Sequence, residues 1–381
     1  MAYRSPWMTE ELEAFRGQFR RFLEKELAPE AEAWRREKMV ARSAWRALGS
    51  MGALLPSVPE AYGGLGTSFA YEAAVLEEVE TVVPELSPGL AVHSAIVAHY
   101  ILNYGSEGQK RRWLPGMAKG ELIGAIAMTE PGTGSDLQNV CTTARRQSNA
   151  YVINGQKTFI TNGQLADLVL VVARTGEPGG KGLSLLVLET KGNDGFRRGR
   201  NLDKIGLHAS DTSELFFDDA IVAPENLLGP EEGKGFAQLM QQLPQERLAL
   251  AIGAVAAMER AVSLTVDYTK ERKAFGQPIL EFQNTSFRLA ERKTEAMIGR
   301  VFVDWCIERL IAGELDTVTA SMAKWWCSQK QVETVDECLQ LHGGYGYMQE
   351  YPISRMFVDA RIQKIYGGTN EIMKLLIARS L

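Results

Sequence analysis

The spacing of apolar residues changes twice along this chain of 381 residues. From residue 9 to about residue 119 it is helical, so that Leu12, Phe15, Phe19 and Leu23 fall on one stripe. Between about residues 124 and 228 the chain has short segments rich in β-branched and aromatic residues, separated by turn signals. Long helical segments return from residue 235 onward. The order helical, β, helical restricts the folds that such a chain can adopt.

We therefore expect an α+β protein in three parts: an N-terminal α-helical domain at residues 1–123, a central, mainly antiparallel β-domain at 124–232, and a C-terminal α-helical domain at 233–381. Strands are predicted at residues 151–153, 158–160, 168–173, 183–188 and 215–217, with turns at 154–155, 162–163 and 178–180. The strongest C-terminal helices are predicted at 248–270, 282–312 and 317–341.

The composition is that of a large enzyme with a substantial core, since 45% of the residues are hydrophobic. The net charge of -5 and the pI near 5.7 argue against a nucleic-acid partner, because a phosphate backbone needs a basic face. The longest apolar run, at residues 248–258, is about half of what a transmembrane helix requires. It predicts a buried helix and no transmembrane segment.

The amino terminus predicts the compartment. Residues 1–7 are soon followed by Glu10 and Glu11, and this stretch lacks both the apolar core of a secretion signal and the acid-poor character of a transit peptide. We expect a cytoplasmic protein.

Several kinds of site have no support in the sequence. The cysteines show no Cys-x-x-Cys spacing and the histidines lack metal-ligand spacing, so we expect reduced thiols and no metal. Neither a Gly-x-Gly-x-x-Gly after a strand nor a phosphate-binding Gly-x-x-x-x-Gly-Lys-Ser/Thr occurs. A nucleotide cofactor would have to be held in another way. The residues concerned are Cys141, Cys306, Cys327 and Cys338, and His93, His99, His208 and His342.

Four stretches carry chemistry. Residues 128–136 combine small hydroxyls, such as Thr129 and Ser135, with glycines that permit close backbone approach, although a plain surface turn has the same composition. Residues 157–163 place the aromatic Phe159 before Thr161. The run at 271–279 includes Arg272, whose planar guanidinium suits a pyrophosphate; a solvated helix end is the alternative. Residues 340–347 form a glycine turn.

Two further segments, at residues 243–247 (Leu-Pro-Gln-Glu-Arg) and 365–371 (Ile-Tyr-Gly-Gly-Thr-Asn-Glu), complete the pattern. Together with the stretches above, they resemble the acyl-CoA dehydrogenase family, and the Tyr-Gly-Gly-Thr-Asn-Glu run is similar to its long-chain branch. The resemblance extends from Thr9 to Arg379. It implies the family's fold, with a C-terminal four-helix bundle, and FAD as the cofactor.

The resemblance also implies which residues bind FAD. Some belong to the subunit that holds the flavin and others to a neighbour, which implies a homotetramer built as a dimer of dimers. Tryptophan is common in the family where this chain has Phe159. The implied contacts are Thr129, Ser135, Phe159, Thr161, Thr369 and Glu371 from one subunit, and Arg272, Gln283, Gln340, Gly343 and Gly344 from its neighbour.

The catalytic base is the main departure. Most members carry the proton-abstracting glutamate where this chain has Gly367, and the long-chain branch takes its base from the first segment, which points to Glu246. Pro244 suggests that Glu246 lies in the first turn of a helix, where an acid stabilised by the helix dipole is the structural alternative. Glu371 is the weaker candidate base.

By the same resemblance, Ser135, Arg247, Gly367 and Gly368 border the substrate. A backbone N–H at Gly367 would stabilise charge on the thioester oxygen.

The implied activity is dehydrogenation of an acyl-CoA to the trans-2-enoyl-CoA, with electrons passed to an electron-transfer flavoprotein. A long or branched acyl chain is expected, and Pro88-Gly89 is expected to bend or open a helix that lines the pocket. Two alternatives remain at this point. A flavin oxidase or monooxygenase on the same fold would let reduced flavin react with air, and a non-catalytic relative would lack a flavin spectrum.

Overall fold

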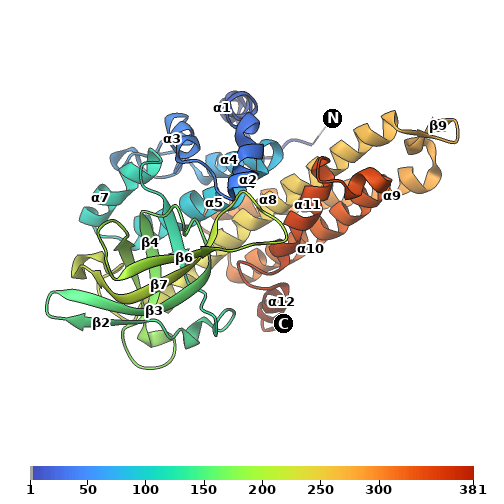
Figure 1. The fold of residues 1–381 in the computed structure, drawn as a ribbon. Coiled ribbons are helices and arrows are strands. Elements are labelled where there is room, and N and C mark those ends of the chain that lie inside the picture. Colours follow the sequence, from blue (N-terminus) through green and yellow to red (C-terminus); the bar gives the residue numbers. More distant parts are fainter. Residues whose placement is uncertain (1–2) are drawn as a thin grey trace.

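The computed structural model describes residues 3–381, and Figure 1 shows the three parts that the sequence predicts. The N-terminal part is helical. Thr9 caps its first helix by accepting a hydrogen bond from Leu12 N, and Ser106 caps its last in a capping box with Gln109. The helices are α1 (Glu10–Phe22), α2 (Ala31–Glu37), α3 (Arg42–Ser50), α4 (Phe69–Val82), α5 (Ser87–Leu90), α6 (Ala98–Tyr104) and α7 (Glu107–Ala118), with π-helical segments η1 (Leu23–Leu27) and η5 (Ala91–Val97).

The central part is a seven-stranded sheet of order β1-β4-β2-β3-β7-β6, with β5 also paired to β4. Most pairs are antiparallel as predicted, whereas β1 and β2 pair with β4 in parallel. The sequence did not predict β1, β2 or β6, which lack a run of β-branched residues. The strands are β1 (Gly124–Ala127), β2 (Thr143–Gln147), β3 (Ala150–Thr161), β4 (Leu168–Arg174), β5 (Leu183–Glu189), β6 (Phe196–Asn201) and β7 (Thr212–Val222).

The predicted turn at Asn154-Gly155 is wrong. Both residues lie inside β3, where the register against β7 shifts. A Cβ atom at Gly155, whose φ is 146°, would lie 2.6 Å from Oγ1 of Thr142. Glycine is required there by a close approach within the sheet rather than by chain reversal. The reversal between β2 and β3 takes place at residues 148–149, where Ser148 has a φ of 50°.

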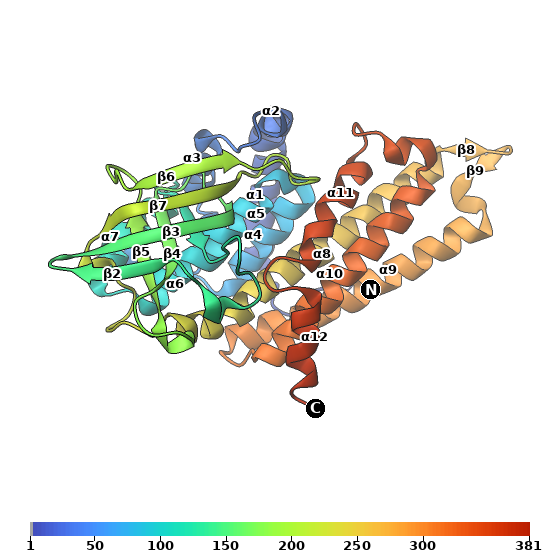
Figure 2. The ribbon, with the colours of Figure 1, turned by 60° about the horizontal axis from the view of Figure 1, so that its bottom comes forward.

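The C-terminal part consists of long helices that extend away from the sheet (Figure 2). The three helices predicted from the sequence lie within α8, α9 and α10, and α11 packs against α8 and α10 to complete a bundle. A small hairpin of β8 and β9 lies at the far end of the bundle. The elements are α8 (Gly235–Glu271), β8 (Lys273–Ala274), β9 (Gln277–Pro278), α9 (Gln283–Ile311), α10 (Thr317–Leu341), α11 (Pro352–Ala360) and α12 (Asn370–Ala378).

Helix α8 is the central element of this part. It is long and apolar enough to cross a membrane by length and composition, but 67% of its most apolar window is buried within the protein. A core helix meets the same criterion, and α8 packs against α4, α9 and α10.

Buried charges tie the N-terminal helices to the bundle. Arg300 of α9 forms ion pairs with Glu77 of α4 and Glu259 of α8. Asp304, one turn later on α9, accepts a hydrogen bond from the Trp7 indole at 3.0 Å. Removing one member of such a buried set leaves the others uncompensated, at a cost of about 3–5 kcal/mol. These contacts fix α4 beside α8, where the candidate site lies.

Candidate active site

Glu246 lies in the interior of α8 and not in its first turn, so the expectation drawn from Pro244 is wrong. The helix begins at Gly235, and Pro244 is an internal residue. The apolar spacing of Phe236, Leu239 and Leu243 continues the helical pattern through the proline, and tertiary packing outweighs the lost backbone hydrogen bond. Glu246 is therefore too far from the helix start for the dipole to stabilise its charge.

The carboxyl of Glu246 is buried, and among residues 3–381 it has one hydrogen-bond partner. Its side chain is only 5% exposed, and Oε1 accepts a hydrogen bond from the Tyr100 hydroxyl at 2.7 Å. Burial raises the pKa of Glu246 from 4.5 to about 7, although the Tyr100 hydrogen bond and the charge of Arg247 oppose the rise. A carboxyl with a pKa near the working pH can both accept and release a proton.

The helix that carries Tyr100 runs antiparallel to α8. Gln242 of α8 donates to the His99 carbonyl at 3.2 Å, and Gln245 donates to the Ala95 carbonyl at 2.8 Å. Later residues of α8 thus face earlier residues of α6, η5 and α5. The register brings α5 alongside the second half of α8.

The irregularity expected near Pro88-Gly89 has a different cause from the one predicted. Pro88 occupies the first turn of α5, where proline is compatible with a helix. The distortion is the seven-residue π-helical segment η5 directly after α5, and such segments are frequent at functional sites. Gly89 instead serves close packing, since its carbonyl accepts a hydrogen bond from Asn162 at 2.9 Å.

The second sequence segment, residues 365–371, approaches α8 at Leu250, which lies one turn after Glu246. Gly367 and Gly368 have φ values of 63° and 91°, in the region that favours glycine. A Cβ atom at Gly367 would lie 2.3 Å from Cδ1 of Leu250. The two segments, far apart in the sequence, therefore meet on one face of α8.

Side chains on one face of α10 form hydrogen bonds with both segments, residues 243–247 and 365–371. Ser321 accepts a hydrogen bond from Arg247 at 3.2 Å. Lys324, one turn along, is fully buried and donates to the Gly368 carbonyl at 2.6 Å and to Asn370 at 3.1 Å. Burial, with a smaller contribution from Arg247, lowers the pKa of Lys324 to about 7. The lysine ties the glycine pair to α10.

Arg247 also has free hydrogen-bonding capacity. Its side chain is 4% exposed, yet within residues 3–381 its Nε has no hydrogen-bond partner. A buried donor of this kind is available to a bound ligand.

The other acid of the second segment is in a different environment. Glu371 is exposed in the first turn of α12, and backbone and Thr369 hydrogen bonds lower its pKa. Thr369 is the N-cap of α12 and accepts from Ile372 N at 3.3 Å. Glu371 thus differs from Glu246 in burial and in the direction of its pKa shift, and it is the poorer general base.

The loop at residues 128–136, predicted to contact the flavin, is held by buried hydrogen bonds on one side and has free space on the other. Lys157 is buried and donates to the Met128 carbonyl and to Glu130, both at 2.9 Å. Glu130 in turn accepts backbone hydrogen bonds from residues 141 and 142. Cβ atoms at Gly132 and Gly134 would meet no atom within 4 Å. Thr129 is half-buried and Ser135 is exposed on this loop.

Phe159 lies beside that loop in a strained conformation. The backbone N–H of the preceding residue, Thr158, donates to the Thr129 carbonyl at 2.9 Å. Phe159 has a φ of 61° at a second register shift of β3, and its ring is 65% exposed. A large aromatic residue in left-handed backbone is costly and marks a functional position. Thr161, two residues on, is half-buried.

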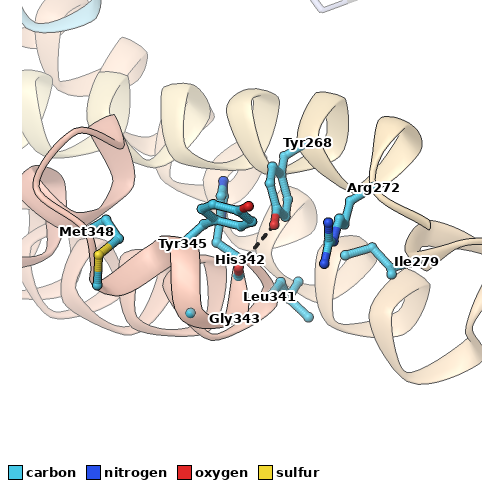
Figure 3. Close-up of a pocket in the computed structure, with 9 residues that line it drawn as sticks. Tyr268, Arg272, Ile279, Leu341, His342, Gly343, Tyr345 and Met348 are labelled. Carbon is cyan, nitrogen blue, oxygen red and sulfur yellow. Dashed lines mark hydrogen bonds between the residues drawn. The ribbon is translucent and has the colours of Figure 1, made fainter. Parts of the chain in front are cut away.

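Three of the residues predicted to contact the FAD of a neighbouring subunit line a separate pocket at the far end of the bundle, with a volume of about 500 Å³ (Figure 3). Arg272, Gly343 and Gly344 line it. Tyr268 stacks on His342 with ring centroids 4.3 Å apart and donates to the His342 carbonyl at 3.1 Å. Gln340 and Gln283 are exposed and do not line the pocket.

This pocket is distant from Glu246 of the same chain. Residues 246 and 271 of α8 are separated by 25 residue steps. At about 1.5 Å per residue they are about 38 Å apart.

Family models match almost the whole chain in the order of its three parts. They describe the N-terminal, middle and C-terminal domains of acyl-CoA dehydrogenases and match residues 9–121, 125–220 and 233–381. The chain belongs to the acyl-CoA dehydrogenase family. The fold class predicted from the sequence is confirmed, and so is the family.

Individual members of the family are similar over most of their length. The mitochondrial long-chain specific acyl-CoA dehydrogenase of Sus scrofa is 47% identical over 97% of this chain and 86% of that protein. An acyl-CoA dehydrogenase structure from Geobacillus kaustophilus is 51% identical, with a TM-score of 0.96 over 99% of both chains. A glutaryl-CoA dehydrogenase from Mycobacterium smegmatis in complex with FADH2 is 28% identical, with a TM-score of 0.92 over 98% of this chain and 95% of that one.

Acyl-CoA dehydrogenases depend on FAD, and this chain has the features to hold it. The loop at Gly132 and Gly134 leaves space above its backbone, and Phe159 offers an exposed aromatic face. Arg272 and Gly343 line a pocket of a size suited to part of a dinucleotide.

Several residues of the site carry no signal in the sequence. Tyr100 lies in an apolar helix, where an aromatic residue is usually part of the core. Lys324 and Lys157 stand among ordinary helix and strand residues, and only their burial distinguishes them. A short-range pattern cannot reveal contacts between residues more than forty positions apart, such as Lys324 with Gly368.

The Tyr100 hydrogen bond should control the acidity of Glu246. In Tyr100→Phe the carboxylate loses its direct donor, so we expect the pKa of Glu246 to rise by about one unit. Infrared titration of the carboxyl band in the purified protein measures it. Tyr104→Phe is the matched control, because Tyr104 donates to Gln238 and Gln241 instead. An unchanged titration in Tyr100→Phe would show that burial alone sets the pKa.

Proposed function

We propose that this acyl-CoA dehydrogenase oxidises long-chain acyl-CoA thioesters to trans-2-enoyl-CoA, with Glu246 as the base that accepts the α-proton. The observation that carries the proposal is the buried Glu246 carboxyl, with a pKa of about 7, one helical turn from the residue that packs on Gly367. The two segments contain two carboxyl side chains, Glu246 and Glu371. Glu371, the alternative, is exposed and more acidic.

The chain's own groups account for the proton transfer. With the thioester seated beside Gly367, its α-proton passes to the Glu246 carboxylate, and the C–H electron pair becomes the new double bond. The carbonyl oxygen gains negative charge, which the backbone N–H of Gly367 is suited to stabilise. Bound FAD supplies the acceptor for the hydride that leaves the β-carbon. Tyr100 keeps the Glu246 carboxylate oriented between turnovers.

Positive charge near the thioester lies on two residues. Arg247 has an unpaired, buried Nε, and Lys324 is hydrogen-bonded to the Gly368 carbonyl. Arg247 favours the developing anion by its charge, and Lys324, whose pKa is lowered to about 7, does so in its protonated form. Ser135 and Gly368 border the same substrate in our proposal.

A long acyl chain is favoured by the similarity to the long-chain specific acyl-CoA dehydrogenase of Sus scrofa, which is 47% identical over 97% of this chain. On the same face of α8, Leu250 and Gly253 follow Glu246 at helical spacing. Each methylene of the substrate that the enzyme buries should contribute about 0.8 kcal/mol. A role in fatty acid β-oxidation, in the cytoplasm, fits this substrate class.

The separation of the two FAD-binding regions supports an assembly of more than one subunit. The open loop at Gly132 and the pocket at Arg272 are at different ends of the protein, and Arg272 is about 38 Å from Glu246 along α8. One FAD cannot bridge both within a subunit, so a second subunit must supply Arg272 and the Gly343 turn. We propose a dimer of dimers, with an electron-transfer flavoprotein as the acceptor of the electrons.

The base assignment is testable by removal and relocation. Glu246→Gln should retain FAD and acyl-CoA binding but lose about 10²- to 10⁴-fold in turnover, measured with a ferrocenium acceptor. Adding Gly367→Glu should restore part of the rate from the other segment. The rescue should be incomplete, because the backbone there is left-handed and Leu250 must move.

Gly367→Gln in the same background is the matched control, since it has the bulk of glutamate without the base and should rescue nothing. Near wild-type turnover in Glu246→Gln would refute the assignment.

The shared cofactor site predicts a link between FAD and assembly. Arg272→Ala should release FAD on dilution and shift the protein toward smaller species, because a ligand bound across subunits stabilises the assembly. Sedimentation with absorbance at the flavin band follows both. Lys270→Ala, two residues earlier and paired only with Asp267, is the control. A monomer with full FAD occupancy would contradict the proposal.

A further inference from the structure

A single buried side chain joins the strand predicted to contact the flavin to α5, the helix directly before η5. Asn162 follows Thr161, the last residue of β3, and is 2% exposed. Its Nδ2 donates to the Gly89 carbonyl of α5 at 2.9 Å and to the Gly124 carbonyl of β1 at 3.1 Å. Both partners are carbonyl oxygens, so this position requires a donor. Three elements from two domains thus meet at one amide.

The local backbone is adapted to this contact. Asn162 has a φ of 64°, a conformation that asparagine tolerates better than most residues. A Cβ atom at Gly89 would lie 2.6 Å from Oδ1 of Asn162, so a larger residue at 89 would displace the amide. The glycine in α5 therefore makes room for the asparagine after β3.

A histidine of η5 holds the same residue of β1 through its N–H group. The Gly124 N–H donates to Nδ1 of His93 at 3.1 Å, and Nε2 of His93 lies 3.1 Å from the Met117 carbonyl. Burial lowers the pKa of His93 to about 4, so the ring is neutral and donates through Nε2. Gly124 is therefore tied to Asn162 through its carbonyl and to η5 through its N–H.

The helical end of this connection reaches the base. Gln245 of α8, the residue before Glu246, donates to the Ala95 carbonyl of η5 at 2.8 Å. At the other end, the strand residues predicted to contact the flavin precede Asn162 by one and three positions. The flavin strand and the base are thus linked through Asn162, α5 and η5.

We infer that Asn162 is a positioning residue, which sets the placement of the flavin-contacting strand relative to Glu246. The inference rests on the proposed function. In that reaction the α-proton passes to Glu246, and the β-hydrogen leaves with its electron pair as hydride to FAD. The two acceptors must meet neighbouring carbons of one substrate. A misplacement of about 1 Å costs about 100-fold in rate, so the residue that links their supports controls the reaction.

Loss of the Asn162 contacts should separate the two transfers. Glu246 and Gly367 both belong to the C-terminal part of the chain, so the thioester and its base stay together without this link. Proton abstraction should therefore persist. The strand that contacts the flavin should shift relative to the substrate, and hydride transfer should slow.

Asn162→Asp keeps the shape of the side chain and replaces the donor by an acceptor. In the FAD-loaded variant, stopped-flow reduction of the flavin by dodecanoyl-CoA should slow by about 10- to 100-fold. Proton abstraction alone is measured by α-hydrogen exchange in an acyl-CoA with sulfur in place of the β-carbon, and should stay within about twofold of wild type. Asn193→Asp is the matched control, because it loses an amide bond to the Ile221 carbonyl elsewhere in the β-domain and should change neither rate.

A spectroscopic readout requires no turnover. The deprotonated sulfur analogue is electron-rich, and against an oxidised flavin it gives a long-wavelength charge-transfer band whose strength depends on the overlap of the two. At saturating analogue and equal FAD content, this band should weaken in Asn162→Asp and stay unchanged in Asn193→Asp.

Gly89→Ala tests the same contact from α5, because its Cβ displaces Oδ1 of Asn162. It should show the same selective loss of flavin reduction, and it decides the question if Asn162→Asp does not fold. Wild-type rates in both assays would overturn the inference. An equal or greater fall in exchange would also overturn it, since that indicates a general loss of structure. Absence of both exchange and flavin reduction in the wild-type enzyme would instead refute the proposed function.

Discussion

The burial of one carboxyl between α6 and α8 is the constraint on which the rest of this site depends. Taking Glu246 out of water raises its pKa from 4.5 to about 7, a difference of about 3 kcal/mol between its two protonation states. The Tyr100 hydrogen bond stabilises the carboxylate and so offsets part of the rise in its pKa. Burial outweighs both the Tyr100 hydrogen bond and the charge of Arg247, which lower the pKa. The chain can therefore place a base of suitable strength in the middle of a core helix.

The location of that base explains the shape of its surroundings. A glutamate at residue 367 would need left-handed backbone and the space that Leu250 occupies. Glycine avoids both conflicts and leaves its N–H free. Lys324 then fixes the pair Gly367-Gly368 against α10, while Ser321 on the same helix accepts from Arg247. A single helix face thus holds both halves of the site.

The sequence was sufficient for features that depend on local pattern or on a distinctive motif. Periodicity located α8, α9 and α10, because each is a long segment with apolar residues at helical spacing. It failed at Gly155, where the requirement for glycine comes from Thr142 on another strand, and at Pro244, where packing carries a helix through a proline. The roles of Tyr100 and Lys324 depend on contacts between distant residues. No spacing rule encodes them.

The most direct measurement of the central claim separates proton abstraction from hydride transfer. An acyl-CoA analogue with sulfur in place of the β-carbon cannot be dehydrogenated, but its α-hydrogens can exchange with solvent deuterium. Mass spectrometry of the analogue after incubation with the FAD-loaded enzyme follows that exchange. If Glu246 is the base, the wild-type protein catalyses exchange at a rate that rises with pH through about 7, and Glu246→Gln does not. Exchange by Glu246→Gln at the wild-type rate would contradict the account.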